Sequence, residues 1–217
     1  MKNLKIKSIA AILSVLICAV PISAEESHPT LTEQKVAAVL VDKATGETID
    51  IDITPVAKGM RSGIEASDSY EVRVALPRDG IQPRGSDTST DQDGYYSVTG
   101  SLTITYDRAL DSHNNYSYKL TKVNGSWKIT DDGVKLSNRG VSWQCSSFSP
   151  RVVQEGHKNP TSNTYSYNTG FTKYIGEYDM NAWVGATSLV DISKGARNWE
   201  LQVTVNKVYN STRSVAR

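Results

Sequence analysis

The chain has 217 residues, and 24 Lys and Arg stand against 23 Asp and Glu, so its formal net charge is +1. This near neutrality argues against a nucleic-acid-binding protein and against one that relies on a basic membrane patch. The length suits one substantial domain that can bury a core without disulfides.

The first 24 residues have the layout of a secretory signal peptide. Lys2, Lys5 and Lys7 precede an apolar core from Ile9 to Val20, and residues 21–24 supply a helix breaker and a small residue at the cut. This core is shorter than the roughly 20 residues that a spanning helix needs, so we expect it to be removed and to leave no membrane span. The protein is therefore expected to be secreted to the extracellular space.

Strand patterns begin soon after this segment. Residues 36–41 and the alternating Ile49, Ile51 and Ile53 flank a Gly-containing turn at 43–46, which predicts a β-hairpin. Residues 57–68 carry glycines and small polar residues and are interpreted as a loop or linker. We therefore interpret residues 25–66 as an N-terminal hairpin segment or extension, with three alternatives: a separate hairpin, a propeptide, or the first strands of the main sheet.

Further alternating segments follow up to Val208. Asn124-Gly125-Ser126 predicts a hairpin turn between strands at 116–123 and 127–130, because Asn-Gly is a strong turn signal. Residues 146–163 are interpreted as a loop. The last strands are expected at 165–174, 183–192 and 199–208.

About nine or ten short strands with no convincing amphipathic helix predict an all-β protein, an antiparallel β-sandwich. A β-barrel is the alternative, because strand tilt around a ring leaves no mark in the sequence. The sandwich is expected over residues 67–211, followed by a short tail at 212–217.

A long polar segment, residues 77–94, separates two strand patterns. Loops of this length are usually functional or mobile. Its acids could form a loose calcium site, but the sequence favours a solvated acidic turn: Asp87, Asp91 and Asp93. No other cofactor is indicated.

Catalytic signatures are weak throughout. Cys145 and His157 could in principle form a thiol nucleophile and its base, but Cys145 is in phase with Val141 and Trp143 and is expected to be buried. No Gly-x-Ser-x-Gly motif is present. Paired carboxylates for hydrolysis stay open, because any two acids can meet in space.

Aromatic content is the clearest hint of recognition, with 11 Tyr and 4 Trp against 2 Phe. Tyr and Trp favour half-exposed recognition sites, and such rings can stack on sugars. Trp143 and Trp199 are in phase with aliphatic residues and are expected in the core. The candidate binding residues are Trp127, Tyr165, Tyr167, Tyr174, Tyr178 and Trp183.

Several short motifs lie between residues 95 and 210: Asn138-Arg139, Cys145, Tyr167 to Phe171, Val184-Gly185-Ala186 and Arg197 to Trp199. Together they resemble a pattern in uncharacterised secreted β-rich proteins of Gram-positive bacteria. The resemblance implies export and a β fold, and no known activity comes with it.

Two functions therefore stand as hypotheses. The first is a secreted, non-catalytic β-sandwich that binds an extracellular protein or carbohydrate. The second is a secreted hydrolase that uses carboxylates or a calcium-dependent loop. The lack of a local catalytic signature favours the first.

Overall fold

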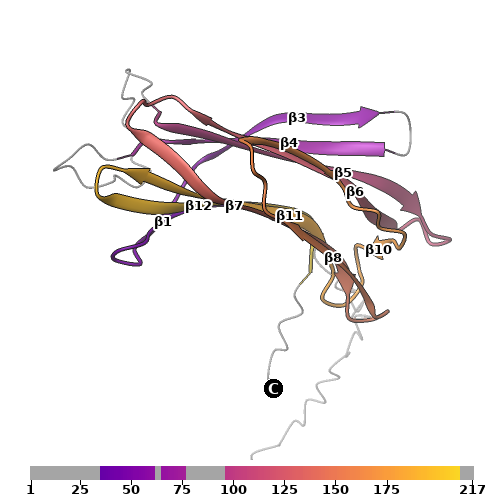
Figure 1. Cartoon of the computed structure of the whole chain (residues 1–217). Helices are drawn as coiled ribbons and strands as arrows, with labels where there is room; N and C mark the ends of the chain where they lie inside the picture. Colours follow the sequence, from indigo (N-terminus) through magenta and orange to yellow (C-terminus); the bar gives the residue numbers. More distant parts are fainter. Residues whose placement is uncertain (1–34, 62–64, 77–95, 211–217) are drawn as a thin grey trace, which may run out of the picture. The chain divides into compact units, whose positions relative to one another are not determined.

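The computed structural model describes residues 35–61, 65–76 and 96–210, and these form twelve strands in two sheets (Figure 1). Sheet 1 has the order β2 (Thr48–Asp50), β1 (Lys35–Asp42), β12 (Arg197–Tyr209), β11 (Trp183–Lys194), β7 (Val134–Ser147) and β8 (Val152–Lys158). Sheet 2 has the order β10 (Ile175–Gly176), β6 (Tyr116–Ile129), β5 (Val98–Leu110), β4 (Glu65–Val74) and β3 (Ile53–Arg61), and β9 (Thr164–Asn168) also pairs with β6.

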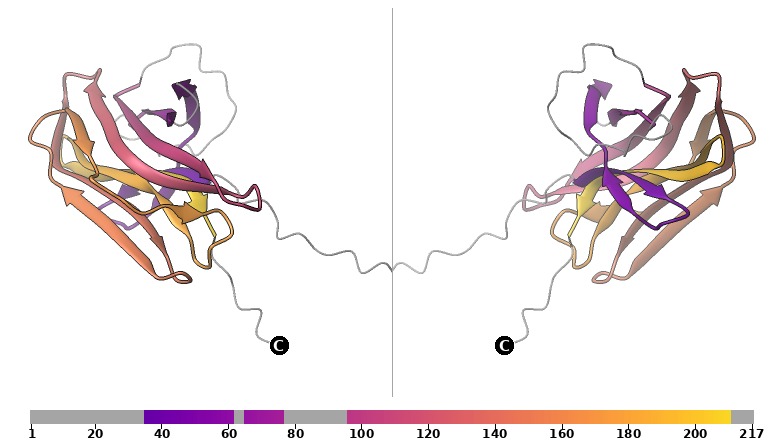
Figure 2. Two further views of the ribbon diagram at one scale, coloured as in Figure 1. Left: turned by 90° about the vertical axis from the view of Figure 1, so that its right-hand side faces the viewer. Right: turned by 90° about the vertical axis from the view of Figure 1, so that its left-hand side faces the viewer.

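The two sheets lie face to face as separate layers (Figure 2). All strand pairs are antiparallel, and each sheet has its own edge strands. The prediction of an antiparallel sandwich is therefore confirmed, and the barrel alternative is wrong. In the described ranges, no helix is long and apolar enough to cross a membrane.

Period-two alternation builds the core between the sheets. On β12 the side chains of Trp199, Leu201, Val203 and Val205 are buried, as the sequence predicts, and the residues between them are more exposed. β5 supplies a matching row from sheet 2. Burying one such side chain is worth about 1.5–3 kcal/mol, so rows of this kind dominate the stability of the fold.

The described part of the N-terminal segment contributes strands to both sheets. β1 and β2 form the predicted hairpin, with Gly46 at a φ of 74° in its turn, and β1 also pairs with β12. The alternating isoleucines do not form one strand, because the chain leaves sheet 1 after Asp50 and enters sheet 2 at Ile53. The alternation of apolar and polar residues therefore continues where the chain passes from one sheet to the other.

The loop predicted at residues 57–68 is wrong. β3 and β4 pair from Ile53 opposite Val72 to Arg61 opposite Glu65, and β4 also pairs with β5 along its whole length. A partner on each side stabilises β4 in spite of its small polar residues, which carry little strand propensity of their own.

The hairpin turn predicted at Asn124-Gly125-Ser126 is also wrong. β6 runs through these residues without a break, because β5 pairs with one of its edges and β9 with the other. A Cβ at Gly125 would overlap the Tyr165 hydroxyl and the Ser101 carbonyl. The glycine therefore serves a close approach of Tyr165 rather than a turn.

Residues 146–163 contain a strand that the sequence does not reveal. β8 pairs with β7 from Val141 opposite Lys158 to Ser147 opposite Val152. It forms one edge of sheet 1. Most of its residues are polar, so the sequence suggests a loop unless the pairing with β7 is known.

Candidate ligand-binding groove

The outer face of sheet 1 carries a polar surface over β7, β8 and β11. Ser142 pairs with His157 on β8 and with Thr187 on β11, and Gln144 pairs with Glu155 and Gly185. These residues alternate with the buried Val141, Trp143 and Cys145, so their side chains point away from the core.

A hollow of about 450 Å³ opens on this surface. Its lining combines residues with hydroxyl, amide, imidazole and carboxylate groups with two tryptophans and small residues: Ser142, Trp143, Gln144, Glu155, Gly156, His157, Trp183, Gly185, Ala186 and Thr187. At Gly185 a Cβ would overlap Asn206 Oδ1 and the Val205 carbonyl. Glycine at this position therefore permits the close approach of Asn206 on β12.

Trp183 is the large apolar group that reaches this hollow from the outer face. Its Nε1 donates a hydrogen bond of 2.7 Å to Asn206 Oδ1, and its ring meets Tyr209 edge to face at 5.9 Å between centroids. Asn206 is buried, so this acceptor is fixed in place. The indole is thus held in one orientation at the edge of the hollow.

A second hollow of about 400 Å³ lies next to the first and shares His157 with it. Its other lining residues are Asn138, Arg139, Gly140, Asn159, Pro160, Thr161 and Leu189. The His157 ring shares a hydrogen bond of 2.8 Å between Nε2 and Asn159 Oδ1. We call the two hollows together the groove, which follows β7 and β8 from Trp183 to Arg139.

Polar contacts hold Arg139 and Asn138, two residues that line the second hollow, in place. Arg139 Nε and Nη2 donate to Asn163 Oδ1 at 3.0 and 2.6 Å. Asn138 has a φ of 46° and donates from Nδ2 to Asp191 Oδ2 at 2.7 Å. Lys43 Nζ donates to the same Asp191 oxygen at 2.6 Å, so the carboxylate that Asn138 contacts is already paired with a cation.

The aromatic residues predicted to bind a ligand do not form one surface. Trp127 and Tyr165 are core residues, with 2% and 8% exposure, so neither reaches a ligand here. Tyr174 and Tyr178 are exposed but lie outside both hollows. Of the predicted set, Trp183 lines the groove.

Tyr167 belongs to a row of rings inside the sandwich. The ring centroids of Trp127 and Tyr165 are 5.0 Å apart, those of Tyr165 and Tyr167 are 5.9 Å apart, and those of Tyr167 and Trp143 are 5.6 Å apart. The last two pairs are stacked. Amphipathic Tyr and Trp rings suit packing between sheets as well as recognition, so their abundance alone does not separate the two roles.

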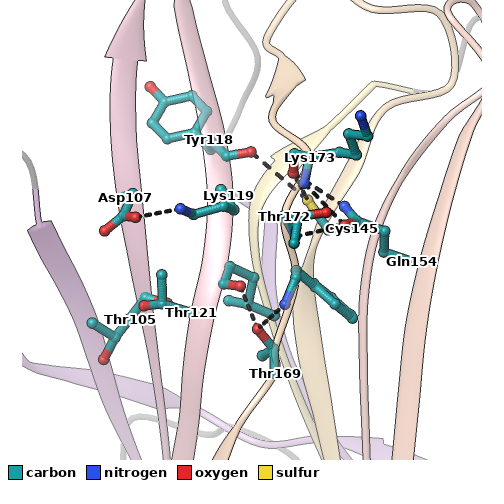
Figure 3. A network of polar contacts seen from close by, with 12 residues as sticks. Thr105, Asp107, Tyr118, Lys119, Thr121, Cys145, Gln154, Thr169, Thr172 and Lys173 are labelled. Carbon is teal, nitrogen blue, oxygen red and sulfur yellow. Dashed lines mark hydrogen bonds and ion pairs between the residues drawn. The ribbon is translucent and has the colours of Figure 1, made fainter.

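Cys145 is buried on the inner side of sheet 1, as its phase predicts (Figure 3). Its Sγ lies 3.7 Å from the carbonyl oxygens of both Tyr118 and Lys173, and its single S–H can donate a weak hydrogen bond to either. Burial raises the pKa of the thiol to about 11. His157 points to the other face of the same sheet, so the two residues do not form a nucleophile and its base.

The segment 169–174 joins β9 to β10 within sheet 2, and it forms hydrogen bonds with both sheets beside β8 (Figure 3). Gln154 Oε1 accepts from the backbone N–H groups of Thr172 and Lys173 at 2.9 and 3.0 Å, and Thr169 Oγ1 donates to the Leu120 carbonyl at 2.5 Å. These bonds tie the edge strand of the groove to sheet 2. The edge strand β8, which lines the groove, is therefore held by contacts in addition to its pairing with β7.

The candidate calcium ligands Asp87, Asp91 and Asp93 lie outside the described residues. Among the residues that the structure does describe, no group of three or more His, Cys, Asp or Glu side chains could hold a metal ion.

Sequence reasoning missed the polar residues of the groove. The alternation of Ser142 and Gln144 with buried neighbours was visible, but their partners Glu155 and His157 lie on the strand that was interpreted as a loop. Arg139 stands out in the sequence only as part of the Asn138-Arg139 motif of the resemblance, which implies no binding role for it.

The fold and the groove define a β-sandwich with a polar groove on the outer face of one sheet. No family model matches the chain, and no curated protein or solved structure is significantly similar to it.

Proposed function

We propose that this protein is a secreted, non-catalytic β-sandwich that binds an extracellular carbohydrate in the groove. The observation that carries the proposal is that the fixed Trp183 indole lines the same hollow as hydroxyl and amide side chains on an open sheet face: Ser142, Gln144 and Thr187. A sugar ring offers an apolar face to an indole and hydroxyl groups to such donors and acceptors.

The shape of the groove supports an extended ligand. Two hollows of about 450 and 400 Å³ meet at His157 along the direction of β7 and β8. Each has the size of a small-molecule site, so a chain of several sugar units suits them together better than a single compact ligand.

The hydrolase hypothesis stays a prediction. Glycoside hydrolysis by the usual route needs two carboxyl groups on either side of the bond. Glu155 is the one acid among the described residues that line the groove. This lining supports binding, and it offers no argument for a reaction.

The test is direct binding of the purified mature protein to neutral polysaccharides, measured by affinity electrophoresis and calorimetry. A methyl-esterified polygalacturonan, a β-glucan and a mannan are suitable probes. We expect Trp183→Ala to weaken binding by about tenfold or more, as removal of a stacked ring does. Phe148→Ala is the matched control, because Phe148 is 66% exposed and lines neither hollow. Equal loss in both variants, or no binding to any probe, would contradict the proposal.

Export is the second part of the proposal, and residues 1–24 support it by their charge and apolar core. The intact mass of protein recovered from the culture fluid of a Gram-positive host should correspond to a chain that starts at or near Glu25. An intact Met1, or retention of the whole product inside the cells, would contradict export.

A further inference from the structure

We infer that the ligand is an acidic glycan, and that Arg139 in the second hollow binds its anionic group. This inference rests on the proposed function, because it assigns a chemical class to the ligand of the same groove. The anionic group is a carboxylate or a phosphodiester, since both present the oxygens that a guanidinium binds.

The first argument is the charge of the second hollow. Arg139 and His157 line it, and no acid does so among the described residues. The other side chains that can donate or accept there are neutral: Asn138, Asn159 and Thr161. The nearby Asp191 is paired with Lys43 and also accepts from Asn138, so it does not neutralise Arg139.

The second argument is the way in which Arg139 is held. Asn163 Oδ1 accepts from Nε and Nη2, which fixes the plane of the guanidinium and leaves other N–H groups of the fork for a ligand. The acceptor is a neutral amide, and the structure gives Arg139 no carboxylate partner within its described residues. A fixed, half-buried and uncompensated guanidinium is a suitable anion-binding group, because little conformational freedom is lost when the anion binds.

The third argument is the contrast between the two hollows. The Trp183 end contains Glu155, which disfavours an anion, whereas the Arg139 end favours one. A glycan would therefore place a neutral sugar at Trp183 and its charged group beyond His157.

The experiment compares a partly methyl-esterified polygalacturonan, which carries both neutral and charged sugar units, with its fully methyl-esterified form, which keeps the sugar chain and removes the charge. We expect the wild-type protein to bind the charged polymer about tenfold more tightly, and this preference to shrink with rising salt. Arg139→Gln should lose most of the preference, whereas Arg139→Lys should keep part of it because the charge remains and the fork is lost.

A second variant tests whether the charge of Arg139, and not a change in folding, is responsible for the preference. Asn163→Asp would place a carboxylate where Arg139 already donates, so the guanidinium stays in position but its charge is compensated. This variant should unfold at or above the wild-type temperature and still lose the preference for the charged polymer. Phe148→Ala again serves as the unaffected control.

Each outcome decides between the proposals. Equal binding of the two polymers, or a preference that survives both Arg139→Gln and Asn163→Asp, overturns the acidic-glycan inference and leaves the groove as a carbohydrate site. Failure to bind either polymer or a poly(glycerol phosphate), while a β-glucan or a mannan is bound, overturns the acidic-glycan inference alone. Failure to bind any of these polymers overturns both proposals. Tighter, Arg139-dependent binding of poly(glycerol phosphate) supports the inference and identifies the anion as a phosphodiester.

Discussion

The indole of Trp143 lies against Gly156 of the neighbouring strand, so that a Cβ at position 156 would come within 2.5 Å of Trp143 Nε1. Trp143 also stacks on Tyr167 at 5.6 Å. The glycine thus lets the ring pack flat between the edge of sheet 1 and β9. Both residues also line the groove, which connects core packing with the site.

Gly156→Ala should therefore destabilise the protein. The new methyl group has to displace a ring that is stacked on its other side, and overpacking of this kind costs about 1–3 kcal/mol. Urea unfolding followed by tryptophan fluorescence measures the loss. Gly133→Ala is the control, because its nearest contact would be Asp131 Oδ1 at 3.4 Å, and it should change stability by less than about 0.5 kcal/mol. Similar losses in the two variants would show that the Trp143 contact is not the cause.

Asn206 should act as a positioning residue for Trp183. The hydrogen bond of 2.7 Å fixes the indole, so Asn206→Ala should weaken polysaccharide binding by about fivefold, the equivalent of about 1 kcal/mol. Trp183→Phe removes the donor of the same bond and keeps an aromatic ring, so it should have a similar effect. The double variant should lose little more than either single variant in calorimetric titrations. Additive losses would mean that the two residues act independently.

Cys145 should be unreactive in the folded protein. Burial raises the pKa of its thiol to about 11, so the thiolate is scarce at neutral pH, and the sulfur is shielded from solvent. A coloured thiol reagent at pH 8 should react only as fast as the protein unfolds, and completely in concentrated urea. Rapid labelling without denaturant would show that the sulfur is accessible. Cys145→Ser should leave polysaccharide binding intact while it costs about 1–3 kcal/mol of stability.

Asp131 should contribute to stability in a way that acid removes. A hydrogen bond from Lys194 Nζ at 2.6 Å, followed by one from the Gly133 N–H, lowers the pKa of its carboxyl group below the usual 3.8. The folded state therefore binds this proton less readily than the unfolded state. The stabilisation is complete above pH 3.8 and falls as the pH drops through the lowered pKa.

Thermal unfolding of Asp131→Asn checks this sign. The variant should melt below the wild type at pH 6, and the two melting temperatures should converge as the pH falls well below 3.8. Asp132→Asn alters the exposed neighbour in the same turn and should follow the wild type throughout. A gap that stays constant with pH would show that the charge of Asp131 is not responsible.

The sequence by itself determined the fold class and the long core strands. Rows such as Trp199, Leu201, Val203 and Val205, and the burial of Cys145, follow from period two, which is a local property of a strand with one buried face. It also marked Trp183 as a candidate binding residue, although the same reasoning selected Trp127 and Tyr165, which are buried.

Only the tertiary structure decided which segments with weak local signals become strands and which become turns or loops. Asn124-Gly125 favours a turn by its own propensity, yet β5 and β9 supply hydrogen bonds on both edges of β6, and these outweigh a preference of about 1 kcal/mol. β8 likewise becomes a strand because β7 lies beside it. The groove depends on this pairing, since His157 and Glu155 face Ser142 and Gln144 only when the two strands are in register. Such contacts join residues far apart in the chain, and a local pattern carries no information about which distant segment will be the partner.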